Sequence, residues 1–214
     1  MKKNLSGLAF LGAALILSCS SAFADSKNSA ENNGGSKILV AYYSDTGTTE
    51  AVARKIAAYL GADLLKIESE TPYTSADLNY GNSNSRVCKE HDAIFGGKGN
   101  GQATAEDMKK VNAKVAASSV VDMSGYSTVF VGYPIWWGMA AWPVNGFVVQ
   151  NDLSGKTVVP FCTSVSSGLG NSGNVLRELA AEHGKSTWLS GKRFGTRAGD
   201  QEVQAWVDSL GIKN

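Results

Sequence analysis

Cysteine is scarce in this chain, which has three in 214 residues. No C-x-x-C pair and no Cys/His spacing typical of a metal site is present, so we expect no bound metal. Cys88 and Cys162 could form a disulfide in an oxidising compartment. Cys162, however, ends an apolar run typical of a strand, which favours a small buried core residue instead. The role of Cys88 is left open.

An excess of charge of either sign is also missing. The chain has 20 Lys and Arg against 19 Asp and Glu, and loss of Lys2 and Lys3 with the N-terminal segment leaves 18 against 19, about −1. No basic patch is present, which argues against a nucleic-acid partner. No strong acidic field is present that would steer the protein toward a basic partner.

Motifs of hydrolytic and nucleotide-hydrolysing enzymes are absent. There is no G-x-S-x-G, no Walker lysine motif, and no histidine placed with a serine and a carboxylate as in a triad. His91 could meet a substrate or cofactor, but an exposed loop histidine is the simpler interpretation. His183, near the end of a predicted helix, is a favourable C-terminal charge. The sequence therefore names no catalytic residue.

The first 24 residues read as an export signal. A basic start precedes the apolar run Leu5–Leu17, which is too short for a membrane span, and Ala22–Ala24 is an A-x-A cleavage site. Residues 1–24 are therefore predicted to be a signal peptide. Ile16–Cys19 also resembles the lipobox of bacterial lipoproteins, in which Cys19 is lipidated. Both readings stay open, and both predict an exported protein, periplasmic or anchored to a membrane outside the cytoplasm.

Residues 25–36 are rich in Gly, Ser and Asn without periodicity, which predicts a flexible linker. Residues 37–214 are predicted to form one α/β domain, because buried strands alternate with amphipathic helices. Residues 69–124 are the least regular part and are predicted to be an irregular insertion, with a helical pattern only at 104–118. Five strands are expected, listed by their residue ranges: 38–43, 62–68, 128–133, 156–162 and 186–190. Helices are expected at 50–60, 143–150, 174–183 and 201–210.

The stretch Lys37–Thr49 (KILVAYYSDTGTT) organises the rest of the chain. An apolar strand stops in a loop of hydroxyls and one glycine, and a helix follows at once. Backbone N–H groups and the helix dipole then converge on one spot, which favours a phosphate. The simpler alternative is that a Ser or Thr here is only a helix N-cap. Four hydroxyls and a glycine in six residues exceed what a cap needs.

Two later strands also end in unusual loops. Pro134–Gly138 is a tight aromatic loop with paired tryptophans, and Thr163–Gly173 is rich in Ser and Gly. Paired tryptophans are often core residues, and a Ser/Gly loop alone says little. Ligands of parallel α/β sheets, however, bind beyond the carboxyl ends of the strands. Three such loops together suit a ligand with a phosphate at one end and a flat aromatic ring at the other.

At these residues the sequence resembles the flavodoxin-like FMN proteins. The resemblance rests on KILVAYYSDTGTTEAVARKIA, TVFVGYPIWWGMAAWPV and LSGKTVVPFCTSVSSGLG, and it covers Lys37 to about Leu210. It implies a three-layer sandwich with a five-stranded parallel sheet in the order 2-1-3-4-5, and FMN at the switch point, as in flavodoxin itself. The first loop matches the family motif S/T-x-T-G-x-T. The second loop is most similar to an exported bacterial branch of the family.

The resemblance assigns the cofactor site to three loops. Phosphate would be bound by Ser44, Asp45, Thr46, Gly47, Thr48 and Thr49. The flavin ring would be bordered by Pro134, Ile135, Trp136, Trp137 and Gly138, and its far edge by Thr163, Ser164, Gly168 and Gly170. No Lys or Arg lies in the first loop, so dipoles alone would meet the phosphate charge.

The implied function is an FMN-dependent redox protein, either an electron carrier or a reductase of a small acceptor such as a quinone. Its partner would be a redox protein or a small molecule, and it would meet a membrane only through a lipid anchor at Cys19. Family members that shuttle electrons are usually strongly acidic, and this chain is near neutral. The alternative is a non-redox module that captures a flavin or nucleotide outside the cell.

Overall fold

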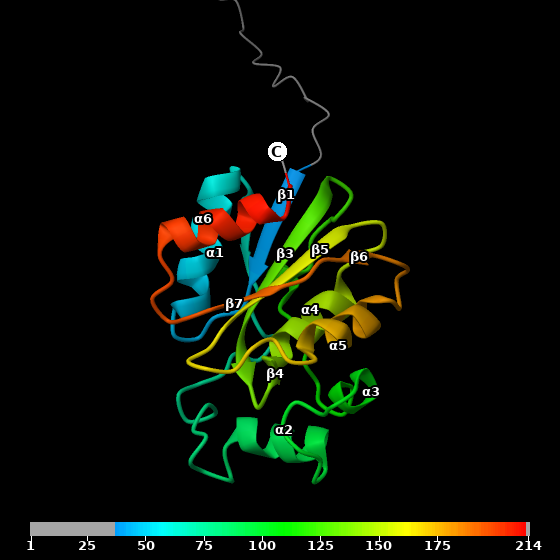
Figure 1. The fold of residues 1–214 in the computed structure, drawn as a ribbon. Coiled ribbons are helices and arrows are strands. Elements are labelled where there is room, and N and C mark those ends of the chain that lie inside the picture. The colour runs from blue at the N-terminus through cyan, green and yellow to red at the C-terminus, as the bar shows by residue number, and fades with distance from the viewer. Residues whose placement is uncertain (1–36, 213–214) are drawn as a thin grey trace, which may run out of the picture. The chain divides into compact units, whose positions relative to one another are not determined.

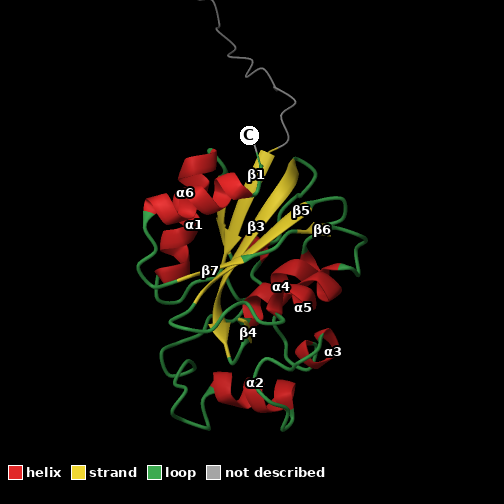
Figure 2. Cartoon of the chain, viewed as in Figure 1, coloured by secondary structure: helices red, strands yellow, loops and turns green. Residues whose placement is uncertain are grey.

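The computed structural model describes residues 37–212, and Figures 1 and 2 show how their helices and strands are arranged. The predicted signal peptide, the lipobox reading at Cys19 and the predicted linker lie outside the described residues. Within the described range no helix is both long and apolar enough to span a bilayer.

A single sheet of seven strands forms the centre of the described domain. Its main path runs in the order β2-β1-β3-β5-β6, and every neighbouring pair on this path is parallel. Counted along the chain these five strands have the order 2-1-3-4-5, so the predicted α/β fold and strand order are confirmed. The five are β1 (Lys37–Tyr42), β2 (Asp63–Lys66), β3 (Tyr126–Trp136), β5 (Thr157–Thr163) and β6 (Thr187–Trp188).

Helices cover both faces of the sheet, which explains why the central strands are almost continuously apolar. Ile38, Val40 and Tyr42 of β1 belong to a core with α1 (Thr48–Leu60) and α6 (Asp200–Ser209). Leu39 and Ala41 point the other way, into a core with α4 (Trp142–Gln150) and α5 (Ser172–Ala180). Figure 1 shows these two helix pairs on opposite sides of the strands. The predicted three-layer sandwich is confirmed.

The predicted number of five strands is wrong, because two short strands were missed. β4 (Met139–Ala140) turns back antiparallel onto Ile135 and Trp136 of β3. β7 (Lys192–Phe194) pairs in parallel with the last three residues of β5. The last strand, expected at 186–190, is shortened to β6, and β7 follows it as a separate strand.

The split between β6 and β7 has a local cause at Pro160. Val158 accepts a hydrogen bond from the Leu189 N–H at 2.9 Å, but Pro160, next on that edge of β5, has no N–H to continue the ladder. Gly191 passes so close that a Cβ there would lie 2.4 Å from the Pro160 carbonyl oxygen. Pairing stops at this point and resumes at Lys192.

The segment 69–124 is more ordered than predicted. Arg86–Phe95, expected to be irregular, forms α2, which is capped by the Ser85 side chain and buries Val87, Ile94 and Phe95. The helix expected at 104–118 starts at Thr104 as predicted, in a capping box with Asp107, but α3 is only Ala105–Met108. A short 3-10 turn follows at Ala117–Ser119.

The early end of α3 reflects a competing set of contacts. Val115 forms a bridge with Ser69, and the flanking bonds Ala116 N–H to Glu68 O and Glu70 N–H to Lys114 O are 2.8 and 2.9 Å. Ala113, the residue before Lys114, packs its carbonyl oxygen against Gly146 of α4. A Cβ on Gly146 would lie only 1.7 Å from that oxygen. The segment 113–116 can form these backbone hydrogen bonds with residues 68–70 only when it is extended, so the helix cannot continue through it.

Candidate functional site

The first loop lies between β1 and α1 and leaves hydrogen-bond donors unused. Gly47 is the N-cap residue with φ 82°, a left-handed conformation that favours glycine, and no side chain caps the helix. Among the described residues, the N–H groups of Asp45, Thr46 and Gly47 meet no acceptor. The interpretation of this loop as a simple side-chain cap is therefore wrong. Free donors at the positive end of a helix suit an anion such as phosphate.

The hydroxyls of this loop fall into two groups. Thr46 and Thr48 have their Oγ1 atoms 3.4 Å apart on the exposed side. Thr49 is buried, and its Oγ1 lies 2.7 Å from that of Thr163 at the end of β5. Thr49 and Thr163 thus join the first and third predicted loops, while Thr46 and Thr48 can face a ligand.

The third loop is held from both sides. The Ser164 N–H donates to the Phe194 carbonyl of β7 at 3.2 Å. Arg193 Nη1 donates to the carbonyls of Ser164 and Val165 at 3.1 and 3.2 Å. Gly168 and Gly170, which were predicted to contact the flavin ring, lie further along the loop and are exposed. This side of the loop is fixed to the sheet and its glycines face solvent.

The second predicted loop is a β-hairpin. Pro134, Ile135 and Trp136 are the last residues of β3, and Trp136 pairs with Met139 of β4. The two-residue turn between them has positive φ at both positions, 47° at Trp137 and 82° at Gly138, as tight hairpins require. Trp137 is the single non-glycine residue with positive φ in the described range. Such strain often marks a functional site.

The two tryptophans have different surroundings. Trp136 is 4% exposed and meets Tyr43 and Tyr73 edge-on, with ring centroids 5.8 and 5.3 Å apart. Trp137 is half-buried and packs against Tyr80 at 4.8 Å and His91 at 4.5 Å. Trp136 is part of the core under the site, and Trp137 is the partly exposed tryptophan of the pair. Flavin contact by either stays a prediction.

Glycines bring the second and third loops together with the segment after α2. A Cβ on Gly138 would lie 2.9 Å from the backbone N and Cα of Gly101. A Cβ on Gly170 would lie 3.2 Å from the Gly138 carbonyl oxygen. The backbones at 101, 138 and 170 can approach this closely only because side chains are absent.

Sequence reasoning missed the aromatic residues that 69–124 brings to this place. Tyr80, half exposed, contacts Trp137. His91 lies on α2 rather than in a loop, and its ring stacks on Phe95 at 4.6 Å, so the reading of His91 as an exposed loop residue is wrong. Aromatic residues within an otherwise polar stretch were the available signal.

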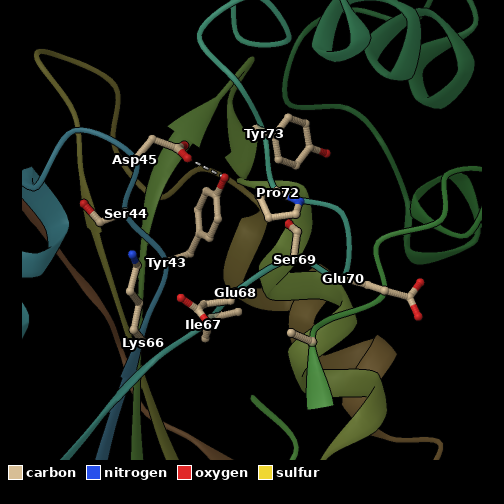
Figure 3. Close-up of a pocket in the computed structure, with 11 residues that line it drawn as sticks. Tyr43, Ser44, Asp45, Lys66, Ile67, Glu68, Ser69, Glu70, Pro72 and Tyr73 are labelled. Atoms are coloured by element: carbon tan, nitrogen blue, oxygen red, sulfur yellow. Dashed lines mark hydrogen bonds between the residues drawn. The ribbon is translucent and has the colours of Figure 1, made fainter. Parts of the chain in front are cut away.

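A pocket of about 360 Å³ opens beside the first loop, over the ends of β1 and β2 (Figure 3). It shares Ser44 and Asp45 with that loop. The Tyr43 hydroxyl donates to Asp45 Oδ1 at 2.7 Å, and burial raises the pKa of the Asp45 carboxyl. The pocket was not foreseen, because its other wall comes from residues 67–73, which follow β2.

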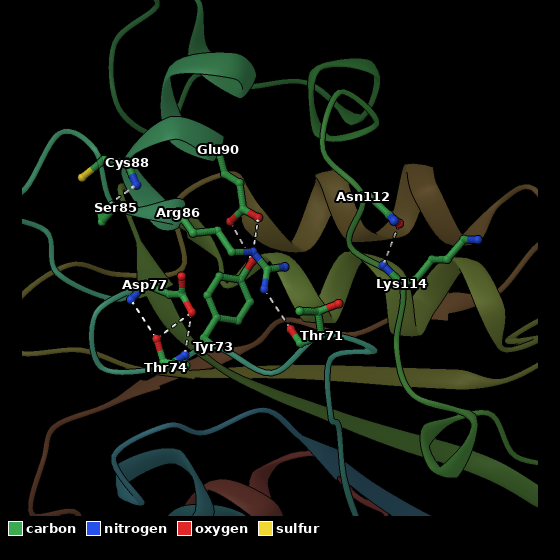
Figure 4. Close-up of polar contacts among 10 residues, drawn as sticks. All are labelled: Thr71, Tyr73, Thr74, Asp77, Ser85, Arg86, Cys88, Glu90, Asn112 and Lys114. Carbon is green, nitrogen blue, oxygen red and sulfur yellow. Dashed lines mark hydrogen bonds and ion pairs between the residues drawn. The ribbon is translucent and has the colours of Figure 1, made fainter.

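A polar network fixes the wall of this pocket (Figure 4). Arg86 donates to Glu90 Oε1 and to the Thr71 carbonyl, both at 2.8 Å, and its guanidinium lies 3.9 Å from the centre of the Tyr73 ring. The Tyr73 hydroxyl donates to Glu90 Oε2 at 2.7 Å. Burial raises the pKa of Tyr43, Tyr73 and Tyr80, so these hydroxyls stay protonated at neutral pH.

The two cysteines of the described range are both free, so the alternative of a Cys88–Cys162 disulfide is wrong. Cys162 is fully buried, as its position at a strand end indicated, and burial raises the pKa of its thiol to about 12. Within residues 37–212 no three His, Cys, Asp or Glu side chains gather as metal ligands would.

The site therefore offers unpaired backbone donors at one end and an aromatic hairpin tip at the other. The unused N–H groups of residues 45–47 fit a phosphate. Because Gly101, Gly138 and Gly170 carry no side chains, the hairpin tip lies close to the backbones of the third loop and of the segment after α2. These features fit a ligand that carries both a phosphate and a flat ring.

Residues 37–210 match the sequence model of a family described as flavodoxin. None of the curated proteins matches this chain in sequence.

Solved structures of flavoproteins are also similar to this chain. The chain is 36% identical to a candidate flavoprotein from Bacteroides eggerthii, with 83% of this chain and 99% of that one covered and a TM-score of 0.67. A candidate flavoprotein from Bacteroides uniformis is 30% identical over 81% and 99% of the two chains, with a TM-score of 0.64. A flavoprotein from Lactobacillus acidophilus in complex with FMN is 20% identical over 80% and 99%, with a TM-score of 0.55, and shares the fold.

Proposed function

This chain belongs to the flavodoxin family, and from that premise we propose that it is an FMN-binding redox protein. Family membership supports FMN as the cofactor. The observation that carries the proposal is the set of unpaired N–H groups at Asp45, Thr46 and Gly47 at the start of α1. When bound, FMN supplies a ring that accepts and donates electrons.

The chain's own residues would bind and orient this cofactor. Thr46 and Thr48 would donate hydroxyls to the phosphate beside the free N–H groups. The Thr49–Thr163 bond would hold the phosphate loop at a fixed distance from the loop after β5. Trp137, supported by Tyr80 and His91, would border the ring and exclude water from one side of it.

The electron acceptor is proposed to be a small molecule such as a quinone, or a redox partner protein. The near-zero net charge of the chain favours these over the role of an acidic long-range shuttle. The proposed setting is outside the cytoplasm, in the periplasm or on a lipid anchor at Cys19, because the first 24 residues read as an export signal. The PIWWG sequence of the hairpin supports a place in an exported branch of the family.

The spectrum of the purified protein tests the proposal. We expect flavin absorbance in the visible range, or its appearance on addition of FMN, and bleaching on anaerobic titration with dithionite followed by recovery with a quinone. Colourless protein that takes up no FMN would contradict the proposal. Bound FMN that neither accepts nor passes on electrons would favour the alternative, a non-redox flavin or nucleotide carrier.

Phosphate binding by the first loop has its own test. Replacement of both Thr46 and Thr48 by valine should weaken FMN binding by about 2–4 kcal/mol, because two hydrogen bonds to a charged group are lost. Thr187→Val, on exposed β6, is the matched control. Fluorescence titration with equal affinity for the double variant and the control would show that these hydroxyls do not meet the phosphate.

A further inference from the structure

A second hollow lies on the outer side of the third loop, where β7 leads to α6. It has a volume of about 510 Å³ and is lined chiefly by Val165, Arg193, Thr196, Arg197, Ala198 and Glu202. Figure 1 shows β7 running beside β5 before the chain enters α6.

The hollow is rigidly connected to the candidate cofactor site. The backbone bond between Ser164 and Phe194 and the two bonds from Arg193 to the loop carbonyls tie its wall to the end of β5. Thr163, the residue before this wall, is the partner of Thr49. A molecule in the hollow would therefore lie beside the loop predicted to border the far edge of the flavin ring.

Charge in this region is unbalanced. Glu202 pairs with Lys192 at 3.5 Å, and Asp200 pairs with Lys55. Arg193 donates only to neutral carbonyls, so its charge is not compensated. Arg197 makes no hydrogen bond or ion pair within the described residues. Two guanidinium groups thus line the hollow without an ion pair, and the carboxylate that also lines it, Glu202, is paired with Lys192.

The same hollow has an apolar wall. Val165 is 86% exposed, the most exposed of the large apolar side chains in the described range. A single exposed apolar residue is ordinary on a protein surface. Here it lies beside two guanidinium groups that have no carboxylate partner, and guanidinium planes also stack on aromatic rings.

We propose that this hollow is a binding site for a small aromatic anion, and that it sets the substrate class of the protein: acceptors whose ring carries a sulfonate or carboxylate. The aromatic ring rests on Val165 and the anionic group pairs with Arg197 and the free edge of Arg193. Arginine often pairs with two oxygens of one anion, as it does with carboxylate and phosphate groups. The role of the site in choosing an electron acceptor rests on the proposed redox function. Binding of an aromatic anion to the hollow does not depend on that function.

Binding of a redox-inert probe to the FMN-loaded protein tests the site. Naphthalene-2-sulfonate and uncharged naphthalene-2-methanol share the same rings, and each is titrated while amide NMR signals are followed. We expect the sulfonate to shift the Val165 and Thr196 signals and to bind at least tenfold more tightly than the alcohol, with the advantage shrinking as salt rises. Arg197→Gln should reduce the sulfonate affinity about tenfold.

Two further variants sharpen the test. Lys185→Gln removes one positive charge two residues before β6, at the other end of the sheet, and should leave sulfonate binding unchanged. Val165→Ser should weaken both probes, because both lose the apolar contact. Equal affinity for the two probes, no effect of Arg197→Gln, or shifts confined to other residues would overturn the proposal.

The flavin absorbance of the same sample separates the two proposals. Sulfonate binding to protein that takes up no FMN would support the anion site and overturn the redox function. FMN-loaded protein that prefers the uncharged probe would overturn only the anion site.

Discussion

Thr49 and Thr163 are 114 positions apart in the chain, yet their hydroxyl oxygens are buried 2.7 Å from each other. Thr49→Val would leave the Thr163 hydroxyl buried without a partner, which costs about 1–3 kcal/mol. Changing both residues to valine removes both polar groups, so the double variant should lose less than the sum of the single variants. Urea unfolding without FMN measures all three. Additive losses would show that the hydroxyls do not depend on each other.

At the scale of elements, the β3–β4 hairpin is positioned by a glycine. Gly138→Ala would place a Cβ 2.9 Å from the Gly101 backbone, at a residue with φ 82°. We expect a loss of about 2 kcal/mol or more, from left-handed strain together with the clash. Gly125→Ala, where a Cβ meets nothing within 4 Å, is the control. If Gly138→Ala and Gly125→Ala unfold at the same temperature, the close approach of Gly138 to the Gly101 backbone is contradicted.

The capping box of α3 makes stability depend on pH. Hydrogen bonds from Lys110, Lys98 and Thr104 lower the pKa of Asp107 in the folded state. A lowered pKa gives stability that is present above the ordinary carboxyl value near 4 and is lost as pH falls below it. Asp107→Asn should therefore be less stable than wild type at pH 6, and the difference should begin to narrow as the pH falls below about 4. Urea midpoints across this range would refute the prediction if the gap stayed constant.

At the scale of the whole molecule, ligand binding and folding are linked. FMN at about 100 times its Kd should stabilise the folded protein by about 2.7 kcal/mol. For a chain of this length that corresponds to a rise in Tm of about 5–10 °C. Calorimetry with and without FMN measures the shift. Riboflavin, which lacks the phosphate, is the matched ligand and should give a smaller rise; an equal rise would argue against the phosphate loop.

The strand order was predicted from the family resemblance. The sequence by itself determined the α/β alternation and the loop of hydroxyls and glycine that leads into α1. These follow from local signals: apolar runs such as Ile38–Tyr42 buried on both faces, and glycine with hydroxyls at a helix start. Thr104 as the start of a helix is equally local, because its partner Asp107 is three residues away.

Only the tertiary structure decided how far α3 extends, where the last strand breaks and what surrounds Trp137. Each depends on groups distant in sequence: Ser69 opposite Val115, Pro160 opposite Gly191, and Tyr80 and His91 against the hairpin tip. Periodicity reports which face of an element is apolar, but not which distant backbone group competes for its hydrogen bonds. That competition is resolved only when the chain is folded.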